Sequence, residues 1–124
     1  MLFRSVGGHL AFRAALDARV ASAACFYATD LHKGSLSVGG DDSLKRAGDI
    51  RAELMLVWGR QDPHIPDDGR ALIHRTLSEK QLRFTWHEFN AQHAFMRDEG
   101  PRYDPALAHL CYGLAVELFK RTLA

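Results

Sequence analysis

The chain has little net charge, no long apolar run and almost no cysteine. Its 16 basic and 15 acidic residues leave a formal net charge of +1, and the two signs are interleaved, which argues against a nucleic-acid-binding arm. No apolar stretch is long enough to cross a bilayer, and the first residues do not have the pattern of a secretory signal peptide. We therefore expect a cytoplasmic protein that binds neither nucleic acid nor membrane.

The two cysteines, Cys25 and Cys111, lie in apolar surroundings and have no CxxC partner. Because nothing points to secretion, buried thiols are favoured over a disulfide between them. At 124 residues and 47% hydrophobic content, the chain is at most one domain with a real core.

Apolar segments of two kinds alternate along the chain. Strands are predicted at about residues 20–27, 54–58 and 82–89. Helices are predicted at about 9–18, 66–78 and 105–122, with a short helical turn at 44–50. The polar, glycine-bearing segment 29–43 is the part of the chain with the least sign of regular secondary structure. Strands that alternate with helices and are apolar throughout indicate a parallel sheet covered on both faces, so the predicted fold class is α/β.

Three reactive side chains stand next to predicted strand ends. Ser5 directly precedes the first helix, Asp62 follows the strand that ends at Trp58, and His93 follows the third strand. Reactive residues of an open parallel sheet lie on loops at the carboxyl ends of its strands. The chain order of nucleophile, acid and histidine is that of the α/β-hydrolases.

These residue types make a serine reactive. A hydroxyl is a weak nucleophile until a base takes its proton, and histidine can do so near neutral pH. A carboxylate on the other ring nitrogen fixes the tautomer and stabilises the imidazolium. Gly7 would let the chain turn sharply after Ser5, and the Val6 N–H would then point at the developing oxyanion.

Several blocks of the sequence resemble the motifs of dienelactone hydrolases. They are Ser5–Phe12, Trp58–Pro66, His93–Arg97, Tyr103-Asp104 and the closing helix. The resemblance implies hydrolysis of an ester or lactone through an acyl-enzyme, with Ser5 as nucleophile, Asp62 as acid and His93 as base. It also implies that Arg97 binds a substrate carboxylate, and that neither a metal nor an organic cofactor is needed.

The family's chain continues far upstream of the nucleophile, whereas four residues precede Ser5 here. We therefore expect residues 1–124 to be the C-terminal portion of such a domain, a partial α/β-hydrolase fold of about three parallel strands flanked by helices, with the N-terminal strands absent. An exposed apolar strand edge would follow. The alternative function is thus a catalytically inactive half-domain that pairs with a missing N-terminal half or with itself.

Each candidate site residue also has a simpler explanation that needs no catalytic role. Ser5 could be a helix N-cap, Asp62 a turn residue before Pro63, His93 a surface-loop histidine, and Arg97 a surface arginine in a salt bridge. An acyltransferase or perhydrolase would use the same triad.

The other histidines are expected at the surface or on helix faces, with two of them near enough to line a cleft. The surface group is His32, His74, His87 and His109, and the cleft pair is His9 and His64. A metal site at His87, Glu88 and His93 is disfavoured, because HExxH sites need two histidines one helical turn apart.

Overall fold

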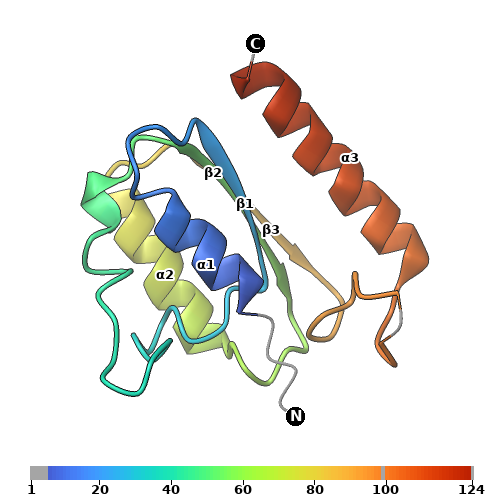
Figure 1. Cartoon of the computed structure of the whole chain (residues 1–124). Coiled ribbons are helices and arrows are strands. Elements are labelled where there is room, and N and C mark those ends of the chain that lie inside the picture. Colours follow the sequence, from blue (N-terminus) through green and yellow to red (C-terminus); the bar gives the residue numbers. More distant parts are fainter. Residues whose placement is uncertain (1–5, 99, 124) are drawn as a thin grey trace.

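The computed structural model describes residues 6–98 and 100–123. It contains a sheet of three parallel strands in the order β1-β2-β3 (Figure 1). The strands are β1 (Ser22–Phe26), β2 (Glu53–Gly59) and β3 (Phe84–Phe89). The predicted α/β class is confirmed, and so is the parallel sheet of three strands.

Helices cover both faces of this sheet. Helices α1 (Gly7–Ala14) and α2 (Asp67–Glu79) lie on one face, and α3 (Pro105–Thr122) lies on the other (Figure 1). A single 3-10 turn, η1 (Ala47–Asp49), precedes β2 and falls inside the predicted helical turn. None of the helices in the described ranges is both long and apolar enough to span a membrane.

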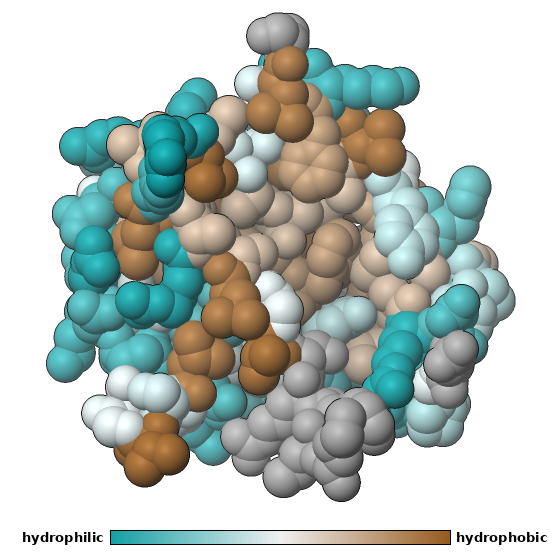
Figure 2. Space-filling model, in the orientation of Figure 1, coloured by the Kyte–Doolittle hydropathy of each residue, from teal (hydrophilic) through white to brown (hydrophobic). Residues whose placement is uncertain are grey.

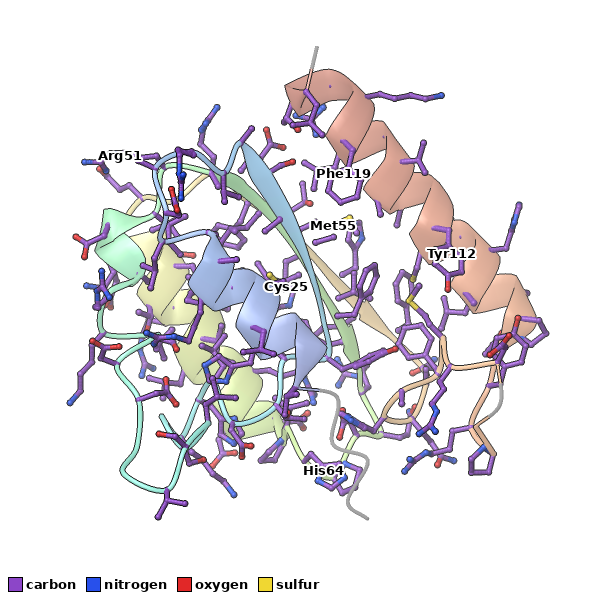
Figure 3. The ribbon with its side chains drawn as sticks, in the orientation of Figure 1. Cys25, Arg51, Met55, His64, Tyr112 and Phe119 are labelled. Atoms are coloured by element: carbon purple, nitrogen blue, oxygen red, sulfur yellow. The ribbon has the colours of Figure 1, made fainter. Side chains whose placement is uncertain are left out.

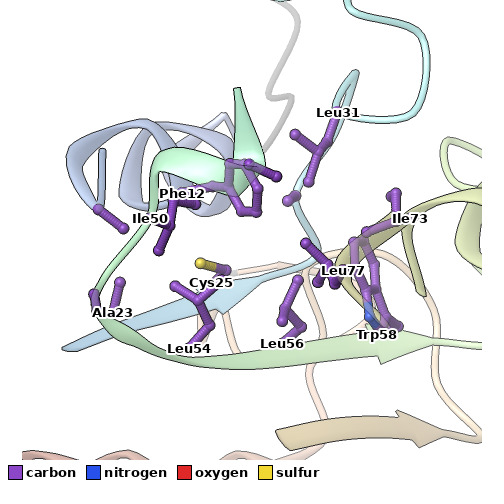
Figure 4. Close-up of a cluster of buried hydrophobic side chains, with 14 of the residues drawn as sticks. Phe12, Ala23, Cys25, Leu31, Ile50, Leu54, Leu56, Trp58, Ile73 and Leu77 are labelled. Carbon is purple, nitrogen blue, oxygen red and sulfur yellow. The ribbon is translucent and has the colours of Figure 1, made fainter. Parts of the chain in front are cut away.

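Strand β2 is central and is buried on both faces, as its unbroken apolar run predicts. Leu54, Leu56 and Trp58 point into the cluster under α1 and α2, together with Phe12 and Ile73 (Figure 4). The alternate side chains, Met55 and Val57, point into a second cluster under α3. Burial of one large apolar side chain contributes about 1.5–3 kcal/mol, so this strand anchors both layers.

Strand β1 differs from its prediction. It begins at Ser22 rather than at residue 20, and only its alternate side chains, Ala23 and Cys25, are buried. The other face of the strand is half-buried, because β1 lies at the edge of the described sheet and α3 covers it only in part. The expectation that β1 is covered on both faces is therefore wrong for this strand.

The ends of the first and last helices have local causes. Helix α1 ends at Ala14, four residues before the predicted end, and the Asp17 carboxylate accepts bonds from the backbone and side chain of Arg19. Such local side-chain bonds compete with continued helix. Helix α3 spans the predicted residues because Pro105 stands at its start and the Asp104 carboxylate accepts from the Leu107 N–H.

Candidate active site

Asp62 lies in the loop that follows β2. Gly59, the last residue of β2, packs so closely on the next loop that an added Cβ would lie 2.4 Å from the Ala91 carbonyl oxygen. The Asp62 side chain is 1% exposed. One of its oxygens accepts the His64 N–H at 2.8 Å. Asp62 is thus oriented by its own loop, as a turn residue would be, and still has its second oxygen for another partner.

That second oxygen lies 2.5 Å from Nδ1 of His93. His93 follows β3 and is fully buried, and Ala94 after it has the left-handed φ of +59°. The two residues meet because parallel neighbours β2 and β3 end at the same edge of the sheet. A carboxylate only accepts, so Nδ1 carries the proton and Nε2 is left as the basic nitrogen.

Two aromatic rings contact the His93 imidazole. The Tyr27 ring lies 5.2 Å away, between centroids, and the His64 ring lies 4.8 Å away, edge to face. His64 stands at the carboxyl edge of the sheet (Figure 3), and its place in a cleft stays a prediction. Sequence reasoning missed Tyr27, although its place directly after β1 was a usable signal.

Arg70 ties the Asp62 loop to β3. The side chain is 3% exposed, and its guanidinium donates to the Ile65 carbonyl at 2.7 Å and to the Glu88 carboxylate at 2.9 Å. It also pairs with Asp67 at the start of α2. A buried arginine needs such partners, and here they join the loop after β2 to the strand that leads to His93.

The remaining predicted site residues are placed as follows. Ser5 lies outside the described residues, so its part in a triad stays a prediction. Val6 is the N-cap residue of α1, and Gly8 brings that helix end against the carboxyl end of β1. Arg97 is exposed and comes directly after the turn that carries His93.

His9 corrects a prediction. It was expected at the surface or lining the cleft, but it is fully buried. Its Nδ1 donates to the Thr29 carbonyl at 2.8 Å, and its Nε2 lies 2.7 Å from the Ser43 hydroxyl and 3.4 Å from an Asp41 carboxylate oxygen. The segment 29–43 is irregular, as predicted, but these bonds fix both of its ends.

The cysteines are free thiols, buried on opposite sides of the sheet. Burial raises the pKa of Cys25 to about 12 and that of Cys111 to about 11. The disulfide alternative is therefore excluded, and both thiols stay protonated at neutral pH.

Other features could mark a ligand site. A hollow of about 950 Å³ lies between segment 31–45 and α2, but neither Asp62 nor His93 lines it. His32 lines this hollow, and burial lowers its pKa. Within residues 6–98 and 100–123, no three His, Cys, Asp or Glu side chains are grouped as a metal site requires. The hydrogen-bonded acid–base pair is the stronger indication of chemistry, because it combines burial with directed geometry.

Comparison with known proteins places the chain among relatives about twice its length. It is 44% identical over 125 residues to a Saccharomyces cerevisiae protein assigned as a carboxymethylenebutenolidase, with 95% of this chain and 46% of that protein aligned. The structure of a Klebsiella pneumoniae protein assigned as a dienelactone hydrolase superposes with a TM-score of 0.83 at 20% identity, over 93% of this chain and 48% of that one.

A more distant structure shares the fold alone. An acylaminoacyl peptidase of Pyrococcus horikoshii gives a TM-score of 0.70 at 19% identity, over 95% of this chain and 23% of the peptidase. The sequence also matches the Dienelactone hydrolase family over residues 5–123. With nearly the whole chain matched, it belongs to the dienelactone hydrolase family.

Proposed function

We propose that this chain carries the nucleophile, acid and base of an ester or lactone hydrolase. The observation that carries the proposal is the buried bond between Asp62 and His93, at 2.5 Å. A surface-loop histidine or a plain turn aspartate would not need such a partner. The carboxymethylenebutenolidase name of the yeast relative supports a lactone as substrate.

The proposed reaction has two halves. In the first, His93 Nε2 takes the Ser5 hydroxyl proton as the serine oxygen attacks the carbonyl carbon. The bond to the leaving oxygen breaks, and the imidazolium returns the proton to that oxygen. In the second, His93 takes a proton from water, the hydroxide attacks the acyl-enzyme, and the serine leaves with the proton. Asp62 stabilises the imidazolium in both halves.

Two further residues have proposed roles. The Val6 N–H would donate to the oxyanion, which fits its place as the N-cap residue of α1. Arg97, exposed and four positions after His93, would bind a carboxylate on the substrate. An Arg97→Gln variant is then expected to raise KM for acidic esters while leaving KM for neutral esters unchanged.

The test is the intact mass of the purified chain after treatment with a fluorophosphonate. The expected result is one adduct, located on Ser5, that disappears in Ser5→Ala and in His93→Ala. His109→Ala is the matched control, because His109 is an exposed helix residue. No adduct on a chain shown by circular dichroism to be folded would overturn the proposal for this chain alone.

A second function is favoured by a different observation. Helix α3 and its C-cap residue expose a stripe of apolar side chains at helical spacing, namely Tyr112 at 58%, Val116 at 48%, Phe119 at 38% and Leu123 at 66%. Such a stripe normally packs against another element. Figure 2 shows apolar side chains gathered around the hollowed face between α1 and α3, and β1 is an edge strand there.

The occupant that fits this face is the rest of a family domain, since the relatives have as much chain again. A further parallel strand would pair with β1, and a helix would cover the stripe. In this second function the chain is a half-domain that needs its partner for activity.

The test mixes the chain with the part of the yeast relative that it does not match, and measures mass by light scattering. A one-to-one complex that Val116→Glu weakens is expected, whereas His109→Glu, on the same helix, should have no effect. If the chain is a monodisperse monomer that unfolds cooperatively and does not bind the added polypeptide, this idea is overturned. Self-association blocked by Val116→Glu would assign the face to a second copy instead.

A further inference from the structure

The backbone at the end of β1 is strained at Tyr27. This residue has φ of +37°, in the left-handed region that bulky side chains seldom adopt. The strain is held by its neighbours, since the Tyr27 N–H donates to the Val57 carbonyl of β2 at 2.8 Å. Strained residues persist where the surrounding structure fixes them, often beside functional sites.

The Tyr27 side chain meets the His93 turn at three points. Its ring contacts the His93 imidazole at 5.2 Å and the Phe95 ring at 5.6 Å, between centroids. Its phenol oxygen accepts a hydrogen bond from the Met96 backbone. One side chain therefore touches the histidine itself and two later residues of the same turn.

The phenol stays neutral in this place. Burial is the main cause that raises the pKa of Tyr27, and it outweighs the opposing hydrogen bond from Met96. An uncharged ring can pack on an imidazole in either protonation state, which a charged wall could not do equally well. A second ring contact comes from His64, at 4.8 Å, so two rings pack against the imidazole while Asp62 binds its Nδ1.

We propose that Tyr27 is a positioning residue for His93, which sets the ring plane and so the direction of Nε2. The Tyr27 ring packs against the imidazole and limits its rotation, and the Tyr27 hydroxyl fixes the turn that carries His93. The inference rests on the proposed function only for its effect on rate. Its structural content concerns the Asp62–His93 pair, which can be observed without turnover.

The experiment follows the His93 Nδ1 proton by NMR in the ¹⁵N-labelled chain, in parallel with the rate of fluorophosphonate labelling. A proton held between imidazole and carboxylate resonates far downfield and stays visible only while the ring is fixed. In Tyr27→Leu we expect this signal to be lost and labelling to slow by about tenfold to a hundredfold, the scale expected when a catalytic group is misplaced. Tyr103→Leu, at an exposed tyrosine, should change neither.

A second variant covers the case in which Tyr27→Leu does not fold. Tyr27→Phe keeps the ring and removes the hydroxyl, so the Nδ1 signal should remain while the Met96 amide exchanges about tenfold faster. An unchanged Nδ1 signal in folded Tyr27→Leu, or unchanged Met96 exchange in Tyr27→Phe, would overturn the inference.

The two proposals fail in different ways. If the parent chain is not labelled but its Nδ1 signal depends on Tyr27, the hydrolase proposal fails and the positioning role stands. If the parent chain is labelled normally and Tyr27→Leu changes neither the labelling nor the Nδ1 signal, the hydrolase proposal stands and the positioning role fails.

Discussion

Gly8 of α1 packs against the carbonyl of Phe26 so closely that a Cβ on Gly8 would lie 2.0 Å from that oxygen. Both sides of the contact are backbone, so neither can rotate away. The close approach brings the first turn of α1 down onto the carboxyl end of β1, where the candidate active site lies.

We expect Gly8→Ala to destabilise the fold by several kcal/mol or to prevent folding, because the backbones must separate. Gly113→Ala is the matched control. Nothing lies within 4 Å of the position its Cβ would take, so it should stabilise α3 by about 0.5–1 kcal/mol. Urea unfolding of both variants measures the difference, and equal effects would show that the Gly8 contact can relax.

Replacing Arg70 should cost more than replacing its exposed neighbour in the same charge network. Arg70→Met leaves the Ile65 carbonyl and the Glu88 carboxylate without their buried donor, which we expect to cost about 2 kcal/mol. Arg60, 53% exposed and 3.6 Å from Glu88, should contribute under about 1 kcal/mol. Thermal unfolding of Arg70→Met and Arg60→Met tests this order; a larger loss for Arg60→Met would contradict it.

Asp62→Asn should keep the fold and remove reactivity. The amide can donate to Nδ1, which turns the histidine to the wrong tautomer, and in a serine protease triad the same change costs about 10⁴ in rate. We expect fluorophosphonate labelling of Asp62→Asn to fall by a similar factor, with the melting temperature nearly unchanged. Labelling at the parent rate would mean that Asp62 does not act on the reaction.

The chain should lose stability in alkali through Cys25. Burial raises the pKa of this thiol from 9.0 to about 12, so above pH 9 the unfolded state releases a proton that the folded state retains. The stability that Cys25 contributes as a buried, neutral thiol is therefore complete below pH 9, and it is lost as the pH rises toward 12. At pH 10 the loss is roughly 1.4 kcal/mol. Urea midpoints from pH 7 to 10 should fall less steeply in Cys25→Ala, and parallel curves would refute the assignment.

His9 should hold the irregular segment 29–43 in place. In His9→Phe, the Thr29 carbonyl and the Ser43 hydroxyl lose a buried partner, a loss that typically costs about 1–3 kcal/mol. We expect faster proteolysis within this segment, read by mass spectrometry. The control is His74→Phe, at an exposed helix position, which should leave the cleavage pattern unchanged. An unchanged pattern in His9→Phe would show that other contacts fix the segment.

The sequence pattern predicted those elements whose local signals agree with their surroundings. Strand β2 and helix α3 were predicted nearly to the residue. An unbroken apolar run marks the strand, and a proline after an aspartate marks the start of the helix, and both signals depend only on neighbouring residues. Strand β1 was less well predicted, since its small side chains do not reveal that one face lies at the sheet edge. The burial of His9 was missed because its partners, Thr29 and Ser43, are distant in sequence.

The candidate site divides in the same way. Asp62 and His93 could be predicted because each follows a recognisable strand, and in a parallel sheet such ends converge. Arg70 could not, since its importance depends on a set of buried partners, and Tyr27 was missed, although it directly follows β1, because its importance depends on a backbone angle. Neither leaves a periodic signal in the chain.

Strands β2 and β3 are joined by α2 alone, so the acid and the base come from one contiguous segment that ends at His93. Closing a connection of this length has a modest entropic cost compared with joining the ends of the chain. During synthesis, domains form progressively as segments emerge. The Asp62–His93 pair could thus assemble while α3 is still being made, and changes within α2 would affect how early this happens.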